Sequence, residues 1–216
     1  MRNSVTKDYK SFSSVSKSRF RKMAKELGYE QLSGINYIKQ RDGWFEGFSL
    51  QASSYGNDFF YINYGISVPN LWEPFDEEIN LKNLGYSLSH RLHHNSGQGF
   101  PNGTKVQIEE SVDLAIEKYM EQASPWFNKI NGLTDITEMY FNSTDLEENK
   151  LGEHDSFLCL KAANYGLFLF KSGDLENSLV WLKEAGRLYS EEEYLEDYEI
   201  DQKNTINNVI KVIKSA

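Results

Sequence analysis

The stretch Phe59-Phe60-Tyr61-Ile62-Asn63-Tyr64-Gly65-Ile66-Ser67-Val68 decides which fold the chain is expected to adopt. From Phe60 to Val68 every second side chain is apolar, and the positions between them carry a hydroxyl, an amide or no side chain. Successive side chains of a strand point to opposite faces of its sheet. The alternation therefore predicts a strand of an antiparallel sheet that is covered on one face and open on the other.

Two more extended segments precede this strand, and one follows it. Residues 35–40 and 44–52 flank Arg41-Asp42-Gly43, and an Asp-Gly pair between extended runs is typical of a β-hairpin. Residues 86–94 alternate again, and a loop rich in Gly, Asn and Ser follows at 95–104. We therefore predict four antiparallel strands.

A basic helix is predicted before the sheet, beginning near Ser14. Its apolar positions follow the spacing i, i+3, i+4, i+7, which places them on one helical face: Phe20, Met23, Ala24 and Leu27. Gly28 comes next, as expected for the residue that ends a helix.

Helical spacing returns after the sheet. We predict one helix that ends near Ala123, and a second that begins with Ser124 as N-cap and Pro125 as first helical residue. A third is expected over 135–141. Residues 142–155 are polar and acidic, and the chain beyond them has helical spacing throughout.

These segments predict four parts: a flexible tail over 1–11, an α+β domain over 12–144, a linker over 145–155 and a helical appendage over 156–216. The predicted fold class is α+β. An antiparallel β-sheet flanked by helices is followed by a C-terminal all-α helical hairpin with a capping helix.

The helical appendage resembles a tetratricopeptide repeat over residues 159–192, with a turn at 172–174. The matching positions are Gly166, Gly173, Leu175, Leu182 and Ala185. Ser178 and Ser190 depart from that pattern, which has Ala and often Pro there. Because one helix pair cannot bury its own apolar face, a third helix over about 206–213 is expected to cap it.

Residues ~18–144 resemble the bacterial domain-of-unknown-function family 4304. The resemblance rests on the order of four elements: Phe48-Ser49-Leu50-Gln51-Ala52-Ser53, Phe60-Tyr61-Ile62-Asn63-Tyr64-Gly65-Ile66, His90-Arg91-Leu92 and Pro125-Trp126-Phe127. It implies a bacterial, cytoplasmic α+β domain with no assigned reaction. No catalytic residue is carried over from it.

The net charge of −9 is unevenly distributed along the chain. Residues 1–41 carry a net +7, and residues 145–201 carry a net −10. An overall acidic chain argues against a dedicated nucleic-acid binder. The acidic region favours a protein partner, a basic one among the candidates; the alternative is that the two charged regions face each other or are solvated.

Composition limits the remaining classes of protein. No apolar run reaches the ~18–20 residues of a membrane span, and no signal peptide is visible, so a cytoplasmic protein without membrane contact is expected. The single cysteine, Cys159, excludes an internal disulfide framework and a cysteine-rich zinc site.

No residue pattern points to catalysis or to a bound metal, and no cofactor is predicted. His93 and His94 would point to opposite faces of a strand, and His90 would lie about 13 Å from His94, too far for one metal ion. Cys159 stands in an apolar run within the acidic region, which is unlike the setting of a catalytic thiol.

The open face of the predicted sheet is the best candidate for binding. The residues expected on it are Gln51, Ser53, Tyr61, Asn63 and Arg91. Amides, aromatic rings and an arginine on a rigid sheet suit recognition. The alternative is an ordinary solvated or helix-covered face on which Gln51 and Asn63 bind each other.

Three classes of function follow. The first is a non-enzymatic protein-interaction or immunity-like module. The second is a small-ligand binder or an enzyme with its site on the polar sheet face. The third is nucleic-acid binding through the basic N-terminal helix, which the net charge disfavours.

Overall fold

The computed structural model describes residues 9–52, 59–81, 84–94, 98–144, 146, 158–192 and 194–216. The chain forms two compact units. The first comprises Met1–Val68 and Asn80–Ile130, and the second comprises Pro69–Ile79 and Asn131–Ala216. Among the described helices, none is long and apolar enough to cross a membrane.

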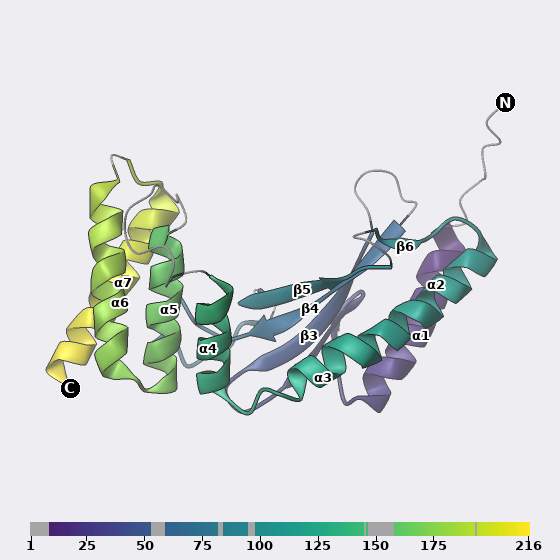
Figure 1. Cartoon of the computed structure of the whole chain (residues 1–216), viewed down its shortest axis with the longest axis horizontal. Coiled ribbons are helices and arrows are strands. Elements are labelled where there is room, and N and C mark those ends of the chain that lie inside the picture. Colours follow the sequence, from purple (N-terminus) through teal and green to yellow (C-terminus); the bar gives the residue numbers. More distant parts are fainter. Residues whose placement is uncertain are drawn as a thin grey trace. The chain divides into compact units, whose positions relative to one another are not determined.

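The first unit contains the predicted antiparallel sheet (Figure 1). Its strands are β1 (Glu30–Ser33), β2 (Asn36–Gln40), β3 (Phe45–Ala52), β4 (Phe59–Ser67), β5 (Leu88–Leu92) and β6 (Phe100–Pro101). They are ordered β1-β2-β3-β4-β5, and β6 pairs with β4 beyond the end of β5. The α+β fold class is confirmed.

The predicted hairpin joins β2 to β3. The Arg41 N–H donates to the Trp44 carbonyl oxygen at 2.8 Å, and Gly43 has a φ of 79°, which favours glycine. Every second residue of β4 from Phe60 onward is buried, as its alternation predicts.

Two short strands were not predicted. The four residues of β1 are mostly exposed and lack an alternating pattern, so nothing in their sequence distinguishes them from a loop. Phe100 and Pro101 fall in the predicted loop at 95–104, but they pair with Phe60 and Phe59 of β4.

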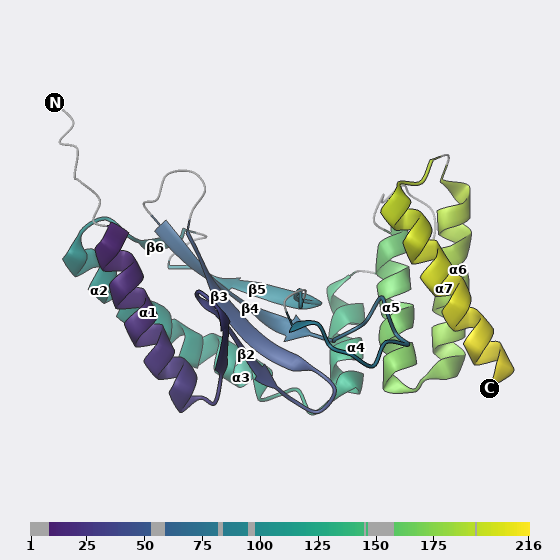
Figure 2. The same cartoon turned by 180° about the vertical axis from the view of Figure 1, so that it is seen from behind.

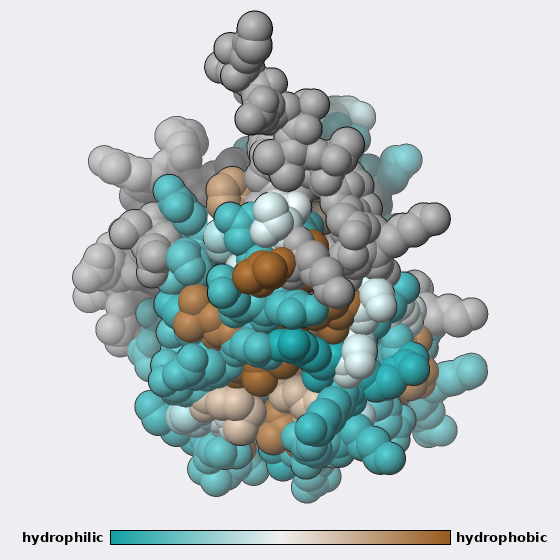
Figure 3. Space-filling model, turned by 90° about the vertical axis from the view of Figure 1, so that its right-hand side faces the viewer, coloured by the Kyte–Doolittle hydropathy of each residue, from teal (hydrophilic) through white to brown (hydrophobic). Residues whose placement is uncertain are grey.

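Helices cover one face of this sheet (Figures 1 and 2). They are α1 (Tyr9–Glu26), α2 (Lys105–Lys118), the π-helical turn η2 (Tyr119–Ala123) and α3 (Ser124–Phe127). Phe48 of β3 lies at the centre of this packing, in ring contact with Phe20, Tyr29, Tyr37 and Tyr119. At the end of the unit seen in Figure 3, apolar side chains form small patches between hydrophilic ones.

The structure corrects two local predictions. The helix α1 begins at Tyr9, so residues 9–11 of the predicted tail are helical, and residues 1–8 lie outside the described residues. Ser124 is not an N-cap, because its backbone is helical (φ −61°, ψ −46°). Pro125 lacks the N–H that an α-helix needs, and the wide turn of η2 lets helical backbone continue past it.

A buried carboxylate ties the helices to the sheet. Glu46 of β3 is 2% exposed, and Arg41 donates to its Oε2 through Nε at 3.0 Å and Nη2 at 2.9 Å. Lys39 Nζ lies 3.5 Å from Oε1 and donates to the Leu27 carbonyl oxygen just after α1. The Tyr29 hydroxyl also forms a hydrogen bond with the Glu46 side chain.

The hydroxyl of Tyr119, from η2, extends this network by donating to the Tyr29 hydroxyl at 2.8 Å. Burial raises the pKa of both phenols well above the usual value, so both stay protonated and can hold these hydrogen bonds.

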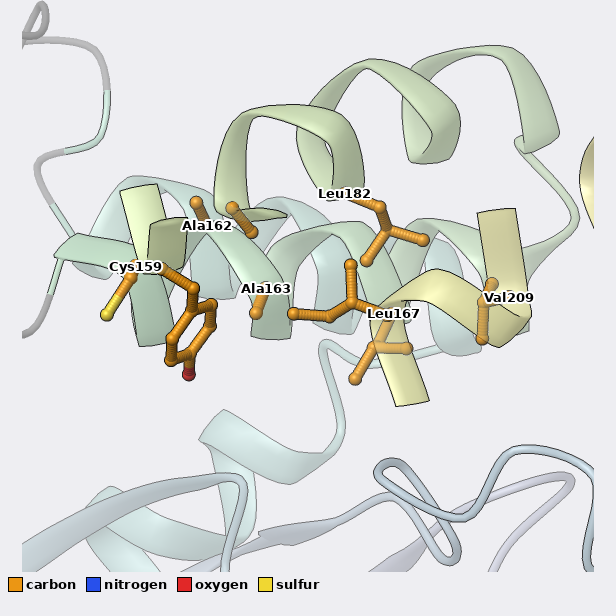
Figure 4. Close-up of a cluster of buried hydrophobic side chains, with 9 residues drawn as sticks. Cys159, Ala162, Ala163, Leu167, Leu182 and Val209 are labelled. Atoms are coloured by element: carbon orange, nitrogen blue, oxygen red, sulfur yellow. The ribbon is translucent and has the colours of Figure 1, made fainter. Parts of the chain in front are cut away.

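The second unit is helical: α4 (Leu133–Ser143), α5 (Leu158–Ser172), α6 (Leu175–Glu191) and α7 (Asp197–Ser215). Figure 4 shows side chains of α5, α6 and α7 meeting in one buried cluster that includes Leu167, Leu182 and Val209. Leu71 and Trp72 of the segment between β4 and β5 also pack against this cluster.

By its contacts, α4 belongs to the second unit, although the sequence analysis placed it with the sheet. The ring of Tyr140 lies 4.9 Å from that of Phe168, and Phe141 lies 4.8 Å from Tyr165. The proposed linker over 145–155 lies outside the described residues except for Leu146, so it stays a prediction.

The helices α5 and α6 approach closely at Gly166. A Cβ there would come within 2.8 Å of the Leu182 side chain. Ser178, which stands where a tetratricopeptide repeat has Ala, is fully buried and donates to the Gly166 carbonyl oxygen at 2.8 Å. The hydroxyl thus has a structural role, and the repeat assignment stays a prediction.

The Glu46 network leads to a stability prediction. Glu46→Gln removes the charge that Arg41 and Lys39 neutralise, and should lower the free energy of unfolding by about 3 kcal/mol. Urea unfolding of the full chain, with amide exchange of β3 as a local reading, measures it. Glu26→Gln is the matched control, because Glu26 forms an ion pair with Lys22 on the exposed side of α1. This variant should lower the free energy of unfolding by less than ~0.5 kcal/mol. Equal effects would contradict a stabilising role for Glu46.

The close approach of α5 and α6 leads to a second stability prediction. Gly166→Val should destabilise the helical unit by about 2 kcal/mol, because Leu182 and its backbone leave no room for the new side chain. Gly186→Ala, in α6 with no atom within 4 Å of its new Cβ, should stabilise the unit by up to ~1 kcal/mol. Amide exchange of α5 compares the two variants. Unchanged protection in Gly166→Val would contradict the crowding, and a loss of protection in Gly186→Ala would contradict the gain from helix propensity.

Candidate functional site

The face of the sheet away from the helices carries the predicted candidate residues. Strand pairing sets Gln51 beside Tyr61, and Ser49 beside Asn63, which in turn pairs with Arg91 of β5. The side chains of these residues therefore share one face. Ser53 lies outside the described residues.

Four of the five candidates form one connected group. Arg91 donates through Nε to the Asn63 Oδ1 at 2.8 Å and through Nη2 to the Gln51 Oε1 at 3.0 Å. The Asn63 Nδ2 donates to the same Gln51 oxygen at 2.9 Å. The amide-to-amide bond of the alternative interpretation is thus present, and both amides also hold the arginine.

Tyr61 completes this group, which we call the Arg91 cluster: Gln51, Tyr61, Asn63 and Arg91. The Arg91 guanidinium carbon lies 4.8 Å from the centroid of the Tyr61 ring, a cation–π contact. Gly99 lies against the same ring, since a Cβ there would come within 2.9 Å of the Tyr61 Cζ. The ring is therefore held in place while the arginine stays exposed.

His93 is a neighbour that the sequence analysis left out of the site. The centroid of its ring lies 6.3 Å from that of the Tyr61 ring, in an edge-on contact. The alternation from Arg91 places residue 93 on the same face, so the signal was present in the spacing. His90 instead faces the helices, 4.8 Å from Trp126, and His94 lies 5.9 Å from Phe100.

The other half of this face is covered by Tyr86, from the segment before β5. Gly47 and Gly65 pair across β3 and β4, and a Cβ at either would come within 3.3 Å of the Tyr86 ring. The missing side chains let the ring lie on the sheet. Burial raises the pKa of Tyr86 to about 12, and a hydrogen bond with Ser49 opposes that shift.

The chemistry available to the remaining candidates is limited. Within the described residues, no group of three His, Cys, Asp or Glu side chains is placed to hold a metal ion. Cys159 is buried beside Tyr189, and burial raises the pKa of its thiol, which disfavours the reactive thiolate.

Together, the fold and the Arg91 cluster define an α+β protein whose sheet is covered by helices on one face and carries an exposed, hydrogen-bonded arginine on the other. The chain belongs to the family described as domain of unknown function (DUF4304), whose model matches residues 20–129. The predicted resemblance is therefore confirmed for the sheet and its helices. No curated protein and no solved structure matches the chain.

The covered phenol of Tyr86 leads to a pH prediction. The unfolded chain releases this proton near pH 10 and the folded chain near pH 12, so stability is present below pH 10 and is lost as the pH rises toward 12. At pH 11 the loss is about 1.4 kcal/mol relative to pH 8.

Tyr86→Phe isolates this effect, because Phe has no proton to release. At pH 8 the variant should be about 1 kcal/mol less stable through the lost Ser49 bond, and near pH 11 that difference should vanish or reverse. Urea unfolding of both proteins at the two pH values measures it. A difference that does not change with pH would mean that this phenol is not buried.

Proposed function

We propose that the chain is a non-enzymatic protein-binding module whose contact surface includes the Arg91 cluster. The observation that carries this proposal is an exposed arginine held by two amides and stacked on a fixed tyrosine. The proposal also places the protein in the bacterial cytoplasm, as the family resemblance implies.

The geometry favours binding because the cluster is already ordered. An arginine side chain normally loses conformational entropy when a partner immobilises it. Here the bonds to the two amides already restrict the arginine, so less entropy is lost on binding. Arginine and tyrosine are also among the side chains that most often dominate the affinity of protein interfaces.

The cluster favours a particular kind of contact. The guanidinium has five N–H donors, and the bonds to Asn63 and Gln51 use one on each of two nitrogens. The remaining donors suit a carboxylate or a carbonyl oxygen of the partner.

A second contact surface is proposed at the start of α7. Tyr194 and Tyr198 are 75% and 61% exposed, and acidic residues surround them: Glu191, Glu192, Glu196, Asp197 and Glu199. Exposed aromatic rings in an acidic setting suit a basic protein partner, as an immunity-like module would require.

The structure gives the nucleic-acid alternative less support. Arg19 of α1 forms an ion pair with Asp113 of α2, Arg21 donates to Gln31, and Phe20 is buried. These two arginines are thus already engaged within the protein, which leaves α1 with less charge for phosphate groups.

Photo-crosslinking in the source cells tests the proposal. Benzoylphenylalanine in place of Ser89, an exposed neighbour of Arg91 on β5, should link the full chain to its partner. The partner is then purified, and its affinity is measured by calorimetry for the unmodified chain and for Arg91→Ala.

Arg91→Ala should weaken binding at least tenfold, because it removes the charge and releases both amides. Arg21→Ala, which removes an exposed arginine of α1 that donates to Gln31 and lies outside both proposed contact surfaces, is the control and should leave the affinity unchanged. Unchanged affinity in Arg91→Ala would refute a role for the cluster.

A further inference from the structure

A pocket of about 430 Å³ opens on the sheet face next to Tyr86. Its lining comes from β1, β2, β3, the end of β4 and the segment before β5, and includes Leu32, Asn36, Ile38, Phe45, Ser49 and Tyr86. A pocket of this volume is large enough for a small organic molecule.

Strand register gives the pocket two chemically different ends. Asn36 pairs with Ser49, so an amide and a hydroxyl lie side by side, and Ser49 also bonds to Tyr86. Two residues further along, Ile38 pairs with Gly47, and Phe45 lies beyond it on β3. One end is therefore polar and the other apolar.

The described lining of the pocket offers no opposite charge to an ionised ligand. Among the lining residues within the described part of the chain, Glu46 is the only charged one. Its carboxylate points to the helix-covered face, where Arg41 and Lys39 bind it. An ion that entered would lose hydration without gaining a partner.

Tyr86 provides a fixed wall for this site. Its ring rests on the paired glycines Gly47 and Gly65, and its hydroxyl bonds to Ser49. The wall and the floor are thus in place before any ligand arrives, which lowers the cost of binding.

We propose that this pocket binds a small uncharged ligand with an apolar body and an amide or hydroxyl head. The head would bind Asn36 and Ser49, and the body would lie against Ile38 and Phe45. The site shares no residue with the Arg91 cluster, so the test of this ligand site does not depend on the protein-binding proposal.

Four probes of one shape test the ligand class. Benzamide and benzyl alcohol are neutral, while benzoate and benzylammonium carry opposite charges on the same ring. Each is titrated into the ¹⁵N-labelled full chain, and the amide signals of Gly47, Ser49 and Tyr86 are followed. The neutral probes should give saturable shifts with a Kd on the order of 1 mM, and the charged probes should bind at least tenfold more weakly.

Variants on one strand test the location. Asn36→Trp fills the polar end and should abolish the shifts, while Gln40→Trp, on the same face of β2 but outside the pocket, should keep them. Ser33→Trp at the exposed rim replaces Asn36→Trp if the latter does not fold. The proposal is overturned by the absence of saturable shifts with both neutral probes, by equal binding of a charged probe, or by shifts that persist in the filled variant.

Discussion

The burial of Glu46 is the constraint on which the first unit depends. A carboxylate without water needs compensating charges, and Arg41 and Lys39 supply them from the preceding hairpin. Because Lys39 pairs directly with Glu46 across the strands, satisfying the carboxylate requires the observed register of β2 on β3. Lys39 and Tyr29 then connect that register to the end of α1.

The register on the covered face also determines the open face. A slip of one residue would turn every side chain of β3 to the opposite side. With Glu46 and Phe48 directed at the helices, Gly47, Ser49 and Gln51 must face away from them. The glycine on which Tyr86 rests, the hydroxyl that it binds and the amide that holds Arg91 are thus consequences of the same packing.

Much of this could be predicted from the alternation in β4 and from the Asp-Gly turn, because both signals are local. The face of Gln51, Tyr61 and Asn63 followed from spacing alone. The position of Arg91 over Tyr61 did not, because it depends on which strand β5 joins, and no local pattern encodes that pairing. The position of Tyr86 on the open face was not predicted, because its ring lies against Gly47 and Gly65, which are distant in the sequence.

The residues that the family model matches indicate which part of the chain would carry each proposed function. The matched residues 20–129 contain the Glu46 network, the Arg91 cluster and the whole pocket. The region of net charge −10, residues 145–201, lies entirely outside the match. A function carried by the sheet face would therefore belong to the matched domain, whereas contact with a basic partner would belong to helices outside the match. Each of the two proposed surfaces lies in a separate compact unit.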